Sequence, residues 1–238
     1  MIVKTASAHH NPDVMQQRTV GRLCQTPVDS SSAFHRNALK RSHQAPAFTL
    51  MELLVVIAII AILIGLLFPA FRAVQNQAKQ TQAKNDLTQI VNAVNAFYTD
   101  YGRYPLVAAD TIYGPAANLN NLLFNSLRGL DPTSNPRQIV FISPPYVKDP
   151  ATPRSGIGTA AANLGQYFDP WGKPYNVEID GGYDNAVANP YTANAGATPN
   201  LQVGVIAWSL GTDGSGATAA ASGDKNVGVY ADDVISWQ

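Results

Sequence analysis

One uninterrupted apolar run constrains this chain more than any other feature. From Leu53 to Phe68 every residue is apolar or glycine, and with Phe48 to Met51 the stretch reaches the ~20 residues that a helix needs to cross a membrane. Pro69 is the first helix breaker after it. A carboxylate in an apolar span costs roughly 2.5–3.5 kcal/mol at mid-bilayer depth, so Glu52, at the start of the run, needs a partner such as an amine.

The chain divides after residue 47 into two parts of opposite charge. Residues 1–47 are net +4 and hold the one cysteine and all four histidines, whereas the remainder is net −4. A mildly acidic body argues against nucleic acid as its main partner, because phosphate binding needs a basic face. The lack of Cys and His after residue 47 excludes disulfides, His-dependent nucleophilic triads and His/Cys zinc sites from the body.

Helical periodicity continues beyond the apolar run. The sequence after Pro69 is polar and helix-favouring, and one apolar face recurs at helical spacing, formed by Leu87, Ile90, Val91, Val94, Phe97 and Tyr98. Gly102 and Pro105 end this pattern. We therefore expect one helix over residues 48–98, with Pro69 as a point where it can bend. Half of it is expected in a membrane and half against a globular head.

The head, residues 99–238, is rich in Ala, Asn, Gly and Pro and has few segments typical of strands. The expected strands are Gln138–Ile142, Tyr175–Ile179, Leu201–Leu210 and Val227–Tyr230, and Gly181–Asn200 is expected to be a loop. Residues 1–47 show no sustained periodicity and are expected to be disordered. The predicted fold class is α+β: a long N-terminal helix on a small antiparallel β-sheet, with a loop-rich C-terminal region.

The segment "AFTLMELLVVIAIIAIL", residues 47–63, resembles the prepilin cleavage and methylation motif of type IV pilins and type II secretion pseudopilins. The resemblance implies that a prepilin peptidase cuts between Ala47 and Phe48 and methylates the new amine of Phe48. Residues 1–47 are then a cleaved cytoplasmic leader. Glu52 is implied to pair with the N-terminal amine of a neighbouring subunit during assembly, which agrees with the rule that desolvated charges are tolerable only when paired.

Two departures from the motif and one alternative accompany this interpretation. The residue before the cut is Ala47, where the family usually has glycine, and the leader is long for the family. Initiation at Met15 would shorten the leader without changing the motif. The alternative is a plain signal anchor, in which Glu52 is only the charge at the membrane boundary.

Three further segments resemble the G-type major pseudopilin of type II secretion: "FYTDYGRYP" (97–105), "DPWGKPY" (169–175), and "SLGTDG" (209–214) followed by "DDVISW" (232–237). In "DPWGKPY", Pro170 and Gly172 are turn formers and Trp171 can pack as a lid on the core, so a structural role is sufficient for them. Together with the N-terminal motif, these segments are scattered over nearly the whole chain after residue 47.

The C-terminal acidic group differs in its chemistry from these structural motifs. The family binds calcium here, and the resemblance implies the ligands Asp213, Asp232, Asp233 and the carbonyl of Leu210. Three carboxylates without a basic neighbour repel one another unless a cation lies between them, and calcium accepts six to eight hard oxygens. The spacer between them, residues 215–231, is longer than usual for the family, and Asp224 within it competes.

The resemblance implies a non-enzymatic structural subunit that polymerises into the periplasmic pseudopilus of a type II secretion system and drives protein export. The expected location is the bacterial inner membrane, with one span and the head in the periplasm. Expected partners are further copies of the chain, the prepilin peptidase, minor pseudopilins, the inner-membrane assembly platform and the lipid bilayer, with no nucleic acid.

Two alternative functions stay open. The first is a type IV pilin for adhesion, motility or DNA uptake, although many such pilins close their C-terminal loop with a disulfide that this head cannot form. The second is a membrane-tethered carboxylate-dependent enzyme such as a glycosidase, for which only Glu178 and scattered aspartates are available. No catalytic residue is predicted.

Overall fold

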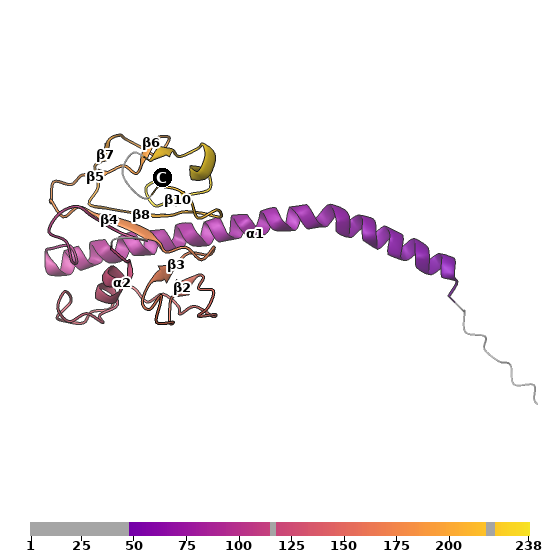
Figure 1. The fold of residues 1–238 in the computed structure, drawn as a ribbon, viewed down its shortest axis with the longest axis horizontal. Helices are drawn as coiled ribbons and strands as arrows, with labels where there is room; N and C mark the ends of the chain where they lie inside the picture. The colour runs from indigo at the N-terminus through magenta and orange to yellow at the C-terminus, as the bar shows by residue number, and fades with distance from the viewer. Residues whose placement is uncertain (1–47, 115–117, 218–221) are drawn as a thin grey trace, which may run out of the picture. The chain divides into compact units, whose positions relative to one another are not determined.

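Helix α1, Leu50–Tyr101, is the longest element of the computed structural model, which describes residues 48–114, 118–217 and 222–238. The helix has 52 residues, runs without interruption through Pro69 and curves along its length (Figure 1). It ends where predicted, because Gly102 has φ +67° and donates its N–H to the carbonyl of Tyr98 at 2.8 Å. Compared with the predicted range of 48–98, the helix begins two residues later and ends three residues later. The predicted leader and the cleavage residue Ala47 lie outside the described residues.

A four-stranded antiparallel sheet packs on the C-terminal half of α1, which confirms the predicted fold class (Figure 1). Its strand order is β1 (Thr111–Tyr113), β4 (Asn176–Ile179), β8 (Val205–Ser209) and β10 (Val234–Ile235). The shorter elements are helix α2 (Asn121–Leu127), the 3-10 helix η1 (Gly228–Tyr230) and the strand pairs β2 (Gly156–Ile157) with β3 (Tyr167–Phe168), β5 (Val187–Ala188) with β7 (Asn200–Leu201), and β6 (Tyr191–Ala193) with β9 (Gly223–Asp224).

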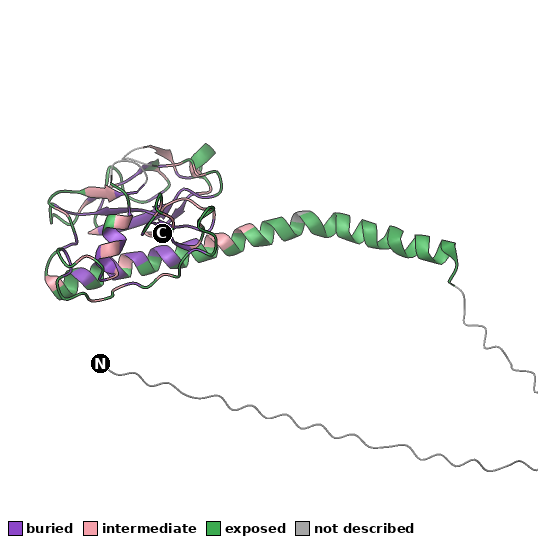
Figure 2. Ribbon diagram, turned by 60° about the horizontal axis from the view of Figure 1, so that its bottom comes forward, coloured by how far each residue is buried: buried purple, intermediate pink, exposed green. Residues whose placement is uncertain are grey.

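The sheet separates two hydrophobic cores. Because successive side chains of a strand point to opposite faces, Val205 and Ala207 of β8 join the core with α1, whereas Ile206 and Trp208 join a second core on the other face. The α1 side of the first core consists of Ala83, Leu87, Ile90, Ala93, Val94 and Phe97. The predicted apolar face is confirmed except at Tyr98, which is 40% exposed, and Val91, which is only partly buried (Figure 2).

The second core covers the outer face of the sheet with the C-terminal segments of the chain. It contains Val187, Tyr191, Ala195, Leu201, Ile206, Trp208, Leu210, Ala217 and Ile235. Glu178 of β4 lies directly opposite Ile206, so it shares this apolar face and is only 4% exposed. The predicted loop over residues 181–200 is therefore partly wrong, since it carries the short strands β5 and β6 and part of this core.

Two predicted strands are absent from the structure. Residues 138–142 are irregular because Asn135 captures their backbone: its side chain accepts from the N–H of Ile139 at 3.1 Å and donates to the carbonyl of Ile139 at 2.7 Å. In the predicted strand 227–230, Val227 is extended but residues 228–230 form η1, because Gly228, with φ +61°, turns the chain. The predicted strand over residues 201–210 is split between β7 and β8.

Candidate functional site: the exposed helix and its collar

The N-terminal half of α1 is apolar all round and exposed. Phe48 is 71% exposed, and the large apolar side chains from Leu50 to Phe71 are between 45% and 87% exposed (Figure 2). The helix is long and apolar enough to cross a membrane, judged by length and composition. Glu52 lies in its first turn, where the backbone N–H groups of a helix start favour a negative charge.

Asn76 marks the point where α1 meets the head. Every described side chain of α1 before Asn76 is exposed, and Asn76 is the first that is partly covered. Its Oδ1 accepts hydrogen bonds from the indole Nε1 of Trp171 at 3.2 Å and from the hydroxyl of Thr212 at 3.3 Å. We call Asn76, Trp171 and Thr212 the helix collar. It joins α1 to two of the segments that the sequence singled out, residues 169–175 and 209–214.

Asp169 ties those two segments together beneath the collar. It is fully buried, and its Oδ1 accepts from the backbone N–H groups of Trp171 at 2.9 Å, Gly172 at 2.7 Å and Lys173 at 2.8 Å. Its Oδ2 accepts from the hydroxyl of Ser209 at 2.5 Å. Burial raises the pKa of Asp169, and the hydrogen bond from Ser209 opposes that rise. The turn character predicted for Gly172 is confirmed, with φ +96°.

The predicted calcium ligands lie in two different environments. Asp232 accepts from the backbone N–H groups of Thr212 at 2.5 Å and Asp213 at 3.1 Å, so Asp213 and Asp232 are neighbours. Asp233 is 5% exposed and accepts from the hydroxyl of Tyr191 at 2.8 Å. Burial raises the pKa of Asp233 to about 7.

The described aspartates do not form a metal centre. Within residues 48–114, 118–217 and 222–238, no three acidic, histidine or cysteine side chains converge on a position that could hold a metal ion. Leu210 is buried in the second core. The Oδ1 atom of Asp233 is buried and has no hydrogen-bond partner among the described residues. Calcium binding stays a prediction.

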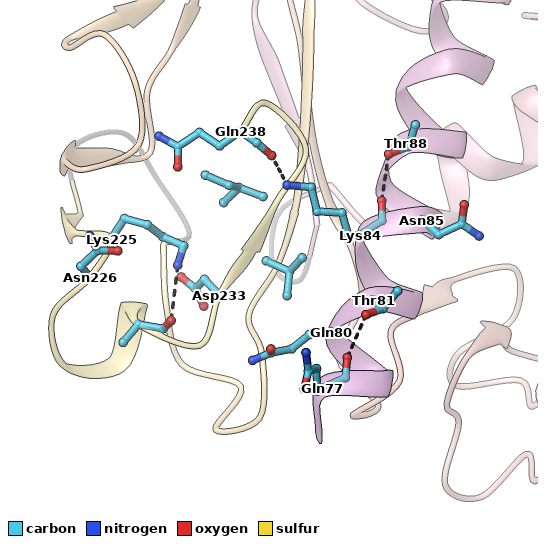
Figure 3. Close-up of a pocket in the computed structure, with 13 residues that line it drawn as sticks. Gln77, Gln80, Thr81, Lys84, Asn85, Thr88, Lys225, Asn226, Asp233 and Gln238 are labelled. Carbon is cyan, nitrogen blue, oxygen red and sulfur yellow. Dashed lines mark hydrogen bonds between the residues drawn. The ribbon is translucent and has the colours of Figure 1, made fainter. Parts of the chain in front are cut away.

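A polar groove of about 690 Å³ lies between α1 and the C-terminal segment (Figure 3). Amide and hydroxyl side chains of α1 line one wall, and Lys225 and Asp233 lie on the other. The ammonium group of Lys84 bridges the groove to the main-chain carbonyl of Gln238. Besides this contact, Val234 of β10 packs in the first core with α1, so the groove lies beside a packed contact between α1 and the C-terminal strand.

Two buried or half-buried polar residues of α1 escaped the sequence prediction. Asp86 is 9% exposed, accepts from the hydroxyl of Tyr175 at 2.9 Å and has a pKa raised by burial. A signal for it existed, because Asp86 lies three residues after Ala83 and four before Ile90, on the predicted apolar face. Asn76 had no such signal, since it is one of several amides in a polar stretch.

Comparison with known proteins adds two similar sequences. Over 130 residues, or 55% of this chain and 70% of the relative, the chain is 29% identical to type II secretion system core protein G of Aeromonas hydrophila. Over 68 residues it is 37% identical to the type IV major pilin protein PilA of Myxococcus xanthus, a match that spans 29% of this chain and 31% of the relative.

No protein-family model and no solved structure matches this chain. The two sequence matches nevertheless agree with the long apolar helix, the antiparallel sheet behind it and the segments that resemble G-type pseudopilins. Together, these observations support a G-type pseudopilin within the type IV pilin-like superfamily.

Proposed function

We propose that this protein is the repeating subunit of the periplasmic pseudopilus of a type II secretion system, where it polymerises through α1 to drive protein export. The exposed apolar half of α1 carries this proposal. An apolar helix surface of this length is unstable in water, and lipid or the helices of other copies can cover it. The match to core protein G selects the secretion system.

The test is complementation of a bacterial strain that lacks its own G-type pseudopilin. Expression of this chain together with its cognate secretion apparatus should restore export of an exoprotein and yield filaments after shearing. Export that stays absent while the protein is present in the inner membrane would contradict the proposal. The proposal includes no catalysis, and the named relatives are structural proteins.

Processing is part of the proposal. We expect co-expression with a prepilin peptidase to produce a mature chain that begins at N-methylated Phe48, and we expect Ala47→Trp to block the cut. Intact-mass analysis distinguishes the outcomes. A retained leader, or a cut after Phe68 as in an ordinary signal sequence, would contradict it.

Calcium binding by Asp213, Asp232, Asp233 and the Leu210 carbonyl is a further part. Support comes from the hard-oxygen donor set and from the buried Oδ1 of Asp233, which accepts no hydrogen bond from the described residues. Asp233 contacts the hydroxyl of Tyr191, and no three acidic side chains among the described residues converge on one position. Binding by all four ligands therefore requires the aspartates to move closer together. Bound calcium would neutralise these carboxylates and hold the C-terminal loop closed.

A type IV pilin is the second candidate, favoured by the match to PilA. The same complementation strain separates the two candidates if it also lacks its major pilin. Surface pili without restored export would select the pilin. Export without surface pili would select the pseudopilin.

A further inference from the structure

Asn76 lies where the exposed half of α1 first meets the head. On the N-terminal side of Asn76 the helix makes no contact that covers a described side chain. On the C-terminal side the first fully buried residue is Ala83. Between the two, Lys79 and Gln80 are only partly covered, and Gln77, Gln80 and Thr81 line the polar groove (Figure 3). The collar is therefore the outermost support of the helix.

We infer that Asn76 is the positioning residue that sets the direction in which the apolar half of α1 leaves the head. Without its two hydrogen bonds, the outermost firm support moves from Asn76 to Ala83, seven residues along the chain. At ~1.5 Å per residue, the unsupported part of the helix grows by about 10 Å. A small rotation at the new support then displaces the far end of the helix more.

The collar requires a hydrogen-bond acceptor at residue 76. Both hydrogen bonds end on the acceptor Oδ1, from a donor on Trp171 and a donor on Thr212. An aspartate at position 76 keeps an acceptor of the same reach, whereas leucine has the same size and no acceptor. Asn76→Asp should therefore preserve the direction of the helix, and Asn76→Leu should lose it. A purely steric role would not separate these two variants.

The experiment measures the angle between helix and head as a distance distribution in the full chain, reconstituted in lipid nanodiscs. Cys24→Ser removes the one native cysteine, and cysteines introduced at the exposed residues Ala70 and Ala162 carry spin labels. Pulsed electron–electron double resonance then compares the distance distribution of the parent with those of Asn76→Leu and Asn76→Asp. The matched control is Asn85→Leu, an exposed amide of the same helix that lines the groove away from the collar.

We expect a broader or shifted distance distribution for Asn76→Leu alone. The indole N–H signal of Trp171 in a ¹H–¹⁵N spectrum, identified with Trp171→Phe, should shift in the same variant and recover in Asn76→Asp. Equal distance distributions for Asn76→Leu and the parent would overturn the inference. A distribution as broad in Asn85→Leu as in Asn76→Leu would also overturn it, because it would mean that any leucine on this part of α1 loosens the helix.

The importance of this direction for assembly rests on the proposed function, but the distance measurement does not. Filament yield is therefore measured separately. A narrow parent distribution without any filaments would count against the proposed function and leave the role of Asn76 intact. Normal filaments from an Asn76→Leu chain with a broadened distribution would show that Asn76 positions the helix without limiting assembly, and would overturn its assembly role.

Discussion

The two halves of α1 are one helix with opposite relations to the rest of the chain. Around Ile60 the helix is apolar on every side and exposed, whereas around Ile90 it has one apolar face and most of that face is buried. The backbone is the same in both halves, so the difference lies in the pattern of side chains. A one-sided pattern is satisfied by a single sheet. A helix with apolar side chains on every face needs apolar neighbours on every side, and the head does not supply them.

The largest predicted effect concerns the exposed half. Glu52→Ala should leave the chain inserted in the membrane and its head folded, and should abolish filament formation, because the N-terminal amine of the neighbouring subunit loses its partner. Glu52→Gln keeps the size of the side chain and should fail in the same way if the charge is what matters. The measurement is the yield of sheared filaments. An unchanged yield would remove the pairing role from Glu52.

A matched pair of substitutions sharpens the comparison between the halves. Ile90→Ala should lower the free energy of unfolding of the head by about 2–5 kcal/mol, since it leaves a cavity in the first core. Ile60→Ala, in the 48%-exposed position, should change it by no more than about 0.5 kcal/mol. Chemical denaturation followed by tryptophan fluorescence reports on the head. Equal losses would mean that the exposed half contributes to folding of the head.

The pH dependence of head stability probes the outer face of the sheet. Burial raises the pKa of Glu178 from 4.5 to about 7 in the folded state. A raised pKa in the folded state means that stability is complete below about 4.5 and falls as pH rises to about 7, by about 1.4 kcal/mol per unit. Glu178→Gln should flatten this slope. It should not remove it, because burial also raises the pKa of Asp233 to about 7 and raises the pKa of Asp86 and Asp169.

An exposed acid provides the control for this measurement. Hydrogen bonds from Thr152 and Ala151 lower the pKa of Asp149, so its contribution to stability is already complete at pH 4.5. Asp149→Asn should therefore leave the slope between pH 4.5 and 7 unchanged. Unfolding curves at several pH values distinguish the two variants, and identical slopes in Glu178→Gln and the parent would contradict the burial argument.

The smallest predicted effect is that of calcium. At a hundredfold excess over its Kd, calcium should stabilise the protein by about 2.7 kcal/mol, and magnesium should substitute poorly because it demands a tight octahedron. Thermal melts should use the full chain, because α1 supplies one side of the first core and residues 99–238 alone lack it. Asp232→Ala should remove the response. A melting temperature that ignores millimolar calcium in the parent would refute the site.

The sequence predicted features that depend on local pattern and missed those that depend on side chains meeting backbone. The apolar run and the helix end at Gly102 are local features, and both are where we expected them. The strand predicted over residues 138–142 is absent because Asn135 competes for its backbone hydrogen bonds, which composition does not reveal.

The short strands and the collar could not be predicted from local sequence, because both depend on partners far away in the chain. A two-residue strand such as β10 has no periodicity to detect, and it forms because β8 offers a partner. Asn76 differs from its neighbouring amides only through Trp171 and Thr212, which are far away in the sequence. For the aspartates, the sequence predicted that Asp213 and Asp232 lie near each other, but it gave no indication that Asp233 turns to Tyr191.

The second core on the outer face of the sheet has a consequence for engineering this protein as a display scaffold. The four strands of the sheet lie between the side chains of the second core and the first core, so a change in the outer layer meets the sheet before it meets α1. Peptide epitopes inserted into exposed turns of that layer can therefore be screened without altering the helix face that the head grips. A filament built from such subunits would carry one copy of the epitope per subunit along its length.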